Sequence, residues 1–223
     1  MRTCVIIPTY NESKAIAGLI DQIIKLGLEV IVIDDGSGDD TVKIAQASGA
    51  KVLCNEVNLG KGASLIKGYN FALTQGFDAL ISIDGDGQHC PQDLMVFIQR
   101  AGNSTAAVIV GNRMGSIKTM PWLRIMTNRI MSGLISLITK QNIPDTQCGF
   151  RLIKKEVLLK LNLSSAKYEI ESEVLIKAAR LGFKIDSVSI KTIYSGQKSQ
   201  INPFMDTLRF IRFLVCESLG ISK

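Results

Sequence analysis

The sequence has few aromatic residues, and only one of its 223 residues is a histidine. Phe, Trp and Tyr together make up 6% of the chain, which does not favour a surface that binds nucleic acid by stacking its bases. Nucleic-acid binding would then depend on positive charge alone. We therefore expect no nucleic-acid partner.

Cysteines are scattered, odd in number, and never spaced as a Cys-x-x-Cys pair. Such a pattern argues against a disulfide framework and a structural zinc site, and it is typical of a reducing compartment. The five are Cys4, Cys54, Cys90, Cys148 and Cys216.

Long hydrophobic runs are also missing. A membrane-spanning helix needs about 20 apolar residues, and the most apolar helical stretch, residues 130–139, has ten uncharged residues. The first twelve residues hold one basic side chain and a short apolar run, which makes a poor signal peptide. These features predict a soluble cytoplasmic chain.

What the chain does have is an ordinary globular composition, 46% apolar and 21% charged. Its charge is uneven: residues 1–111 hold 8 basic and 12 acidic side chains, and residues 112–223 hold 18 and 8. An acidic half suits a metal cation, and a basic half suits an anionic partner or lipid surface. We predict a single domain over 1–223, in which residues 1–112 form the half suited to a metal and residues 113–223 the half suited to an anionic partner.

Short β-branched runs alternate with helical stretches through the first half. Alternation of this kind predicts an α/β fold with a Rossmann-like, mostly parallel central sheet flanked by helices. The expected strands are residues 3–8, 29–34, 51–55, 79–84 and 107–112, and the expected helices are residues 14–26, 41–47, 62–74 and 91–101.

In the second half, we expect helices over residues 121–139, 168–181 and 203–219 and strands over 145–153 and 184–193. The first of these helices carries Trp122 and is predicted either to pack in the core or to lie at a bilayer surface. The last is amphipathic. A polar loop at 195–203 either closes over a ligand or is an ordinary surface loop.

Polar residues gather where three predicted strands end. Pro-Thr-Tyr-Asn-Glu follows the first strand, Asp34-Asp35-Gly36-Ser37 the second, and Asp84-Gly85-Asp86-Gly87 the fourth. Ligands bind at the carboxyl ends of strands in such sheets. Three polar clusters on one edge therefore predict one site.

The run IDGDGQH carries Asp84 and Asp86 two residues apart among glycines. In an extended strand, both carboxylates point the same way and suit Mg²⁺ or Mn²⁺ with positions left for phosphate oxygens. Gln88 continues the series. The alternative is a plain Asp/Gly turn. His89 either touches phosphate or makes a structural hydrogen bond.

In IDDGSGDDT, a carboxylate of Asp34 or Asp35 can accept N–H groups of a base or hydroxyls of a ribose. Asp39 or Asp40 can cap the next helix, and Asp40 is the better candidate. NLGKGAS can bring Lys61 and a helix N-terminus near phosphates, or it is a simple turn, since it lacks the full P-loop pattern.

Taken together, IIPTYNE, IDDGSGDDT, NLGKGAS, IDGDGQH, GNR and DTQCGFR, in this order and spacing, resemble the family-2 inverting glycosyltransferases of the GT-A fold. The chain is most similar to the dolichyl- and polyprenyl-phosphate mannose and glucose synthases. The resemblance covers about residues 3–195.

The resemblance implies roles for individual residues. On the donor side, the positions that surround the nucleotide are Pro8, Tyr10, Glu12, Asp35, Lys61 and Gly62. The positions that hold the metal and the diphosphate are Asp84, Asp86 and Gln88.

On the acceptor side, Arg113 and Arg124 match basic residues that approach an acceptor phosphate. Residues 145–151 match the segment beside the acceptor, with Cys148 where relatives usually have serine. Glu171 and Glu173 match an acidic pair that carries a catalytic base in many relatives.

The expected function is metal-dependent, inverting transfer of a hexose from a UDP- or GDP-sugar, with a polyprenyl phosphate as the favoured acceptor. A phosphate acceptor needs cations to position it, whereas a hydroxyl acceptor needs a general base. The alternatives are transfer to a sugar hydroxyl in polysaccharide or cell-envelope glycan synthesis, and nucleotide-sugar binding without catalysis. We expect a cytoplasmic protein with peripheral contact at the inner face of the membrane.

Overall fold

The computed structural model describes residues 1–115, 120–191, 210 and 212–214. They form a seven-stranded sheet in the order β3-β2-β1-β4-β6-β5-β7. The strands are β1 (Thr3–Thr9), β2 (Glu29–Asp34), β3 (Lys51–Cys54), β4 (Ala79–Ser82), β5 (Val108–Asn112), β6 (Arg151–Lys154) and β7 (Ile185–Ser189). β6 runs antiparallel to β4 and β5, and the other pairs are parallel. The predicted mostly parallel sheet is confirmed.

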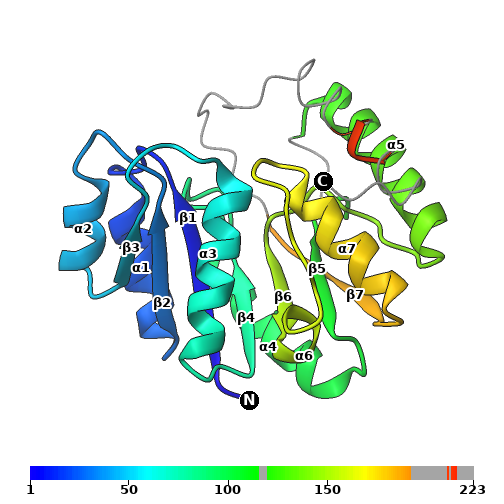
Figure 1. Ribbon diagram of the computed structural model, residues 1–223, viewed down its shortest axis with the longest axis horizontal. Helices are drawn as coiled ribbons and strands as arrows, with labels where there is room; N and C mark the ends of the chain where they lie inside the picture. The colour runs from blue at the N-terminus through cyan, green and yellow to red at the C-terminus, as the bar shows by residue number, and fades with distance from the viewer. Residues whose placement is uncertain (116–119, 192–209, 211, 215–223) are drawn as a thin grey trace.

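Helices cover both faces of the sheet (Figure 1). They are α1 (Ile16–Lys25), α2 (Thr41–Ala47), α3 (Lys61–Thr74), α4 (Leu94–Asn103), α5 (Trp122–Thr139), α6 (Lys155–Leu158) and α7 (Ile170–Arg180), with a 3₁₀ turn at Pro91–Asp93. Strands β1 and β4 are mostly apolar and almost entirely buried, because helices pack on both sides of them. Gly68 lets α3 approach the sheet closely, since a Cβ there would lie 2.7 Å from Ile33 and 2.8 Å from Ile6.

Three predicted strands, β4, β6 and β7, are clearly shorter than expected, and two of them bear on the site. β4 ends at Ser82, so Asp84 and Asp86 lie in a turn and not in extended strand. The argument that both carboxylates point the same way along a strand was therefore wrong, although the pair does stand at the sheet edge. β6 begins at Arg151 and not at residue 145, because the preceding segment bonds to side chains of other elements.

Of the two expected candidates for the cap of α2, the preference for Asp40 was wrong. Asp40 occupies the N-cap position but makes no capping hydrogen bond. Asp39 makes the capping hydrogen bond instead: its Oδ1 accepts from the Thr41 backbone N–H at 3.0 Å.

The expected loop at 195–203 lies outside the described residues, as does the helix at 203–219 except for 210 and 212–214. Phe210 is buried against the core. Across the described ranges, none of the helices combines the length and the apolar character that crossing a membrane requires.

Candidate active site

The loops after β1 and β2 are fastened to each other. Asn11 adopts a left-handed backbone conformation with φ of 58°, which asparagine tolerates better than most residues. Its backbone N–H donates to Ser37 Oγ at 2.8 Å, and its Oδ1 accepts from the Gly38 N–H at 2.9 Å. The Glu12 N–H donates to Thr41 Oγ1. Half-buried Tyr10 and Glu12 are thereby held beside the second polar cluster.

Asp35 is buried and organises the third loop of the site. Its Oδ1 accepts hydrogen bonds from Asn55 Nδ2 at 2.8 Å and from the Leu59 N–H at 2.9 Å, and its Oδ2 accepts from the Gly60 N–H at 2.7 Å. Three of the lone pairs of this carboxylate are thus used within the protein. A contact with a nucleotide would use what remains, so Asp35 also has a structural role that the sequence did not predict.

Lys61 joins two carboxylates at the start of α3. Its Nζ lies 2.6 Å from Asp84 Oδ1 and 2.6 Å from Glu171 Oε1. Burial alone would lower the pKa of Lys61, but the charges of Asp84 and Glu171 outweigh it and raise that pKa. Lys61 in turn, followed by His89, lowers the pKa of Asp84 against the opposite effect of burial. Both groups therefore stay charged across the physiological range.

Glycines allow this pair to sit where it does. A Cβ on Gly149, in the DTQCGFR segment, would lie 2.7 Å from Lys61 Nζ and 2.9 Å from both Asp84 oxygens. A Cβ on Gly62 would lie 2.1 Å from the Ser165 carbonyl oxygen. The NLGKGAS and DTQCGFR motifs are therefore in close contact around Lys61, with the backbone at Gly149 lying against the Lys61 side chain.

The turn after β4 brings further acidic groups together. Burial, followed by the charge of Asp84, raises the pKa of Asp86. Burial first, and then the charges of Asp86, Asp39 and Asp84, raise the pKa of Glu12 from 4.5 to about 7. Neighbouring carboxylates that disfavour one another's ionisation are characteristic of functional sites.

This arrangement fits a hard divalent cation. Asp84 and Asp86 offer carboxylate oxygens, the ligands that Mg²⁺ and Mn²⁺ prefer, and a cation would relieve the repulsion that raises the pKa of Asp86. Gln88 lies next to the pair, and its backbone N–H donates to Asp86 Oδ1 at 3.0 Å. No cluster of three or more His, Cys, Asp or Glu side chains suited to a metal occurs in the described part of the chain.

The raised pKa of Glu12 leads to a prediction about stability. Folded, the carboxyl keeps its proton up to about pH 7, whereas in the unfolded chain it loses it near pH 4.5. The contribution of this group to the free energy of unfolding is therefore full below pH 4.5 and is lost as the pH rises through 7. We expect Glu12→Gln to gain stability relative to the wild type over that window in urea unfolding, and a difference independent of pH would contradict this.

His89 is buried at the edge of this cluster. Its Nε2 lies 3.8 Å from Asp84 Oδ2, and its ring packs on Phe150 with centroids 5.2 Å apart. Its Nδ1 has no hydrogen-bond partner among the described residues. The expected structural hydrogen bond is therefore missing at Nδ1, and Nε2 faces the carboxylate.

Arg113 is buried and paired. Its side chain makes a two-pronged contact with Asp145, with Nε to Oδ2 at 2.8 Å and Nη2 to Oδ1 at 2.9 Å. Asn128 Nδ2 on α5 donates to the same carboxylate at 2.6 Å. Asp145 thereby ties α5 to the end of β5. Arg113 would meet an acceptor phosphate only by sharing its charge with Asp145.

The remaining predicted residues lie apart from Lys61. Glu173 is buried and accepts hydrogen bonds from the backbone N–H groups of Ser164 and Ser165, and it pairs with Lys177 at 2.6 Å. Residues i and i+2 of a helix point in different directions, so of the acidic pair Glu171 reaches Lys61 and Glu173 holds the loop before α7. Arg124 is exposed on α5, and Pro8 is half-buried in β1.

Sequence reasoning missed one buried cation. Arg151 is 1% exposed, and its guanidinium donates to the backbone carbonyls of Cys148 and Glu171. It connects the DTQCGFR segment to the first turn of α7, and so it positions Glu171. A charged residue at the start of an apolar strand is the signal that the sequence offered.

These features define an α/β protein with an acidic site at the carboxyl edge of its sheet. Residues 4–161 match the sequence model of glycosyl transferase family 2. The chain therefore belongs to glycosyltransferase family 2, and the predicted enzyme class and GT-A fold are confirmed.

The chain is also similar to relatives that have named activities. The chain is 32% identical over 213 residues to the UDP-N-acetylglucosamine–dolichyl-phosphate N-acetylglucosaminyltransferase of Methanococcus voltae, covering 85% of each chain. It is 28% identical over 203 residues to the polyprenol monophosphomannose synthase of Mycolicibacterium smegmatis, covering 85% of this chain and 76% of the relative.

A solved structure shows the same fold. Glucosyl-3-phosphoglycerate synthase from Mycobacterium tuberculosis, crystallised with Mn²⁺, UDP and phosphoglyceric acid, superposes with a TM-score of 0.74 at 23% identity. The match covers 98% of this chain and 77% of that one.

Proposed function

We propose that the chain catalyses inverting transfer of a hexose from a UDP- or GDP-sugar to a polyprenyl phosphate. The observation that carries the proposal is the acidic turn at Asp84 and Asp86, which faces Lys61 at the sheet edge where the first two motif loops also lie. Relatives named as dolichyl- or polyprenyl-phosphate sugar transferases support the acceptor.

Different residues of the chain would bind the nucleoside and the diphosphate. The loops with Tyr10, Glu12 and Asp35 bind the nucleoside, and Asp84 and Asp86 with Gln88 would hold Mg²⁺ or Mn²⁺ against the diphosphate. When bound, that cation acts as a Lewis acid for the leaving diphosphate. Lys61 adds a second positive charge on the same side, kept in place by Glu171.

A phosphate acceptor attacks the anomeric carbon directly, so this reaction needs no proton removed. Arg113 and Arg124 are the cations proposed to draw the acceptor phosphate in. Under this account, Glu171 is a positioning residue for Lys61. If the acceptor were a sugar hydroxyl, Glu171 would instead be a candidate general base.

The two acceptors differ in the pH dependence that they predict for Glu171→Gln. With a phosphate acceptor we expect a lower rate but an unchanged shape of the kcat profile, because no base is lost. A general base makes kcat rise with pH on the acidic side of the profile. Loss of that rise in Glu171→Gln would favour the hydroxyl alternative. The profile is measured with each acceptor in turn, as transfer of labelled sugar into polyprenyl phosphate in detergent and into an oligosaccharide, with Asp40→Asn on α2's exposed N-terminus as the control.

We further propose that 1–223 works as one domain, with residues 1–112 serving the donor and metal and residues 113–223 the acceptor. We place the reaction in the cytoplasm at the inner face of the membrane, since its proposed acceptor is a membrane lipid.

A further inference from the structure

The two aspartates of the acidic turn have unequal partners. Asp84 faces a basic side chain at both carboxylate oxygens, because Lys61 Nζ lies 2.6 Å from Oδ1 and His89 Nε2 lies 3.8 Å from Oδ2. Asp86 accepts a hydrogen bond from the Gln88 N–H, and none of the described residues places a cationic side chain within ion-pair distance of it. The protein therefore pairs Asp84 with its own lysine and leaves Asp86 available.

Lys61 has a second, more deeply buried partner. Its Nζ lies 2.6 Å from Glu171 Oε1, and the Glu171 side chain is 8% exposed whereas that of Asp84 is 29% exposed. Arg151 binds the backbone carbonyl of Glu171 and fixes that end of the contact. Water screens the more exposed of two ion pairs more strongly. The Asp84 contact is therefore the one that Lys61 can give up while it stays paired with Glu171.

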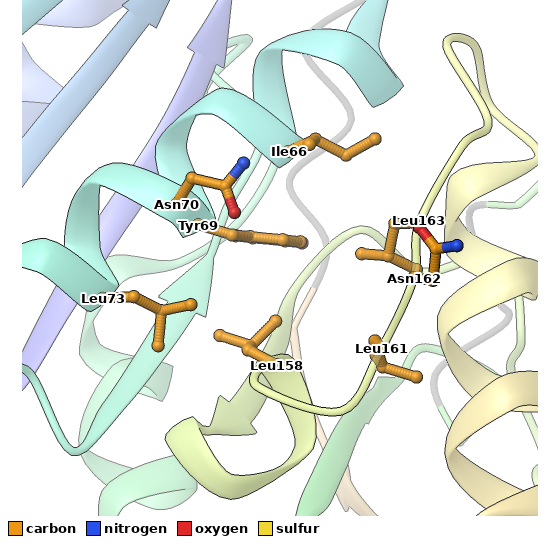
Figure 2. A pocket seen from close by; sticks show the side chains of 8 residues that line it. All are labelled: Ile66, Tyr69, Asn70, Leu73, Leu158, Leu161, Asn162 and Leu163. Atoms are coloured by element: carbon orange, nitrogen blue, oxygen red, sulfur yellow. The ribbon is translucent and has the colours of Figure 1, made fainter.

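The backbone that carries Lys61 is held on both sides of it. A Cβ on Gly60 would lie 2.5 Å from the Ala166 carbonyl oxygen, and one on Gly62 would lie 2.1 Å from that of Ser165. Farther along α3, the helix and residues 158–163 line a pocket between them (Figure 2). The start of α3 is thus the closely packed end of this contact, and a shift of Lys61 away from Asp84 involves its side chain alone.

A divalent cation and Lys61 would compete for the same carboxylate. Asp84 and Asp86 are the residues that would hold Mg²⁺ or Mn²⁺ in the proposed function. Because the ammonium group lies against Asp84 Oδ1, a divalent cation bound by Asp84 either stays beside that positive charge or takes its place. Positive charges this close repel each other strongly in a partly buried site. A bound diphosphate relieves the conflict, because it offers the ammonium group another anionic partner.

We infer that Asp84 is a switched ligand: Lys61 holds it, and a bound nucleoside diphosphate draws Lys61 away and releases Asp84 to the divalent cation, whereas Asp86 is available throughout. The inference rests on the proposed function in that the site binds a nucleoside diphosphate and a divalent cation. It makes metal and nucleotide binding reinforce each other beyond their direct contact, because both favour the same position of Lys61.

The test begins with Mn²⁺ binding to the full chain without nucleotide or acceptor, followed by electron paramagnetic resonance of the free ion. Lys61→Met should bind Mn²⁺ at least about tenfold more tightly than the wild type, because the competing charge is gone. In an Asp84→Asn background the same substitution should gain no more than about twofold, because the carboxylate that both cations seek is missing. No gain in the first comparison, or an equal gain in both, would overturn the inference.

The second measurement repeats the titration with saturating UDP and then GDP, corrected for the complex that Mn²⁺ forms with each nucleotide in solution. With nucleotide bound, the wild type and Lys61→Met should bind Mn²⁺ within about threefold of each other, because Lys61 has already left Asp84. A tenfold gain that persists would contradict the release of Asp84. Binding of neither nucleotide would reject the proposed function, while the experiment without nucleotide still decides whether Lys61 and the metal compete.

Two control variants separate this effect from net charge and from a loosened helix. Lys43→Met removes an exposed lysine paired with Asp40, and Leu73→Ala, in the pocket of Figure 2, loosens α3 without changing its charge. Both should bind Mn²⁺ as the wild type does, and a tenfold gain by either would overturn the inference. If thermal unfolding shows that Lys61→Met is not folded, Lys61→Gln replaces it with the same expected results, since its amide still donates hydrogen bonds but carries no charge.

Discussion

Replacing Asp86 by asparagine is expected to lower sugar transfer by about a thousandfold, the loss that follows when charge stabilisation of the leaving diphosphate is removed. The fold should survive, because asparagine Oδ1 can still accept the hydrogen bond from the Gln88 N–H. Removing a carboxylate from an acidic cluster also relieves repulsion, so stability should hold or rise.

The measurement is kcat/KM with Mn²⁺ varied, alongside thermal unfolding of the same samples. Asp40→Asn serves as the control, because Asp40 is an exposed acidic residue paired with Lys43 on the surface. Unimpaired, metal-dependent transfer by Asp86→Asn would remove Asp86 from the site.

Replacing Lys61 by methionine is expected to produce the largest change in stability. Its ammonium group is mostly buried between Asp84 and Glu171, so its loss leaves two carboxylates without their common partner. Breaking a buried ion pair on one side costs about 3–5 kcal/mol. For a chain of this length, that lowers the melting temperature by roughly 10 °C.

A double-mutant cycle with Glu171→Gln separates the pairing from other effects. Because the double variant leaves one unpaired carboxylate fewer than Lys61→Met alone, its loss should be smaller than the sum of the single losses, by about 0.5–3 kcal/mol. Lys43→Met is the matched control, since the exposed Lys43–Asp40 pair is worth less than about 1 kcal/mol. Strict additivity would mean that Lys61 and Glu171 do not interact in solution.

Local patterns were sufficient to predict most of the first half of the fold. β2 and α2 lie where alternating apolar runs and Asp/Gly turns placed them, because a buried parallel strand and the helix that follows it both leave marks within a few residues. The acidic turn was found for the same reason, since its residues are neighbours in sequence.

Contacts between distant residues left no such mark. Lys61 and Glu171 are 110 positions apart, and nothing in either motif indicates that one will meet the other. Helix α5 was predicted from its run of apolar residues, but the side of it that packs inward was not. Its buried residues are Asn128, Ser132 and Ile135, and the partners of Asn128 and Ser132 in the loop before β6 become apparent only in three dimensions.

The most direct test of the account is transfer itself. Purified chain, Mn²⁺ and polyprenyl phosphate in detergent are mixed with labelled UDP- and GDP-sugars in turn, and the label is followed into the lipid phase. The account predicts labelled lipid from one nucleotide class, dependent on the metal and lost in Asp86→Asn. Label that reaches lipid equally well without metal, or in Asp86→Asn, would contradict the central role given to the acidic turn.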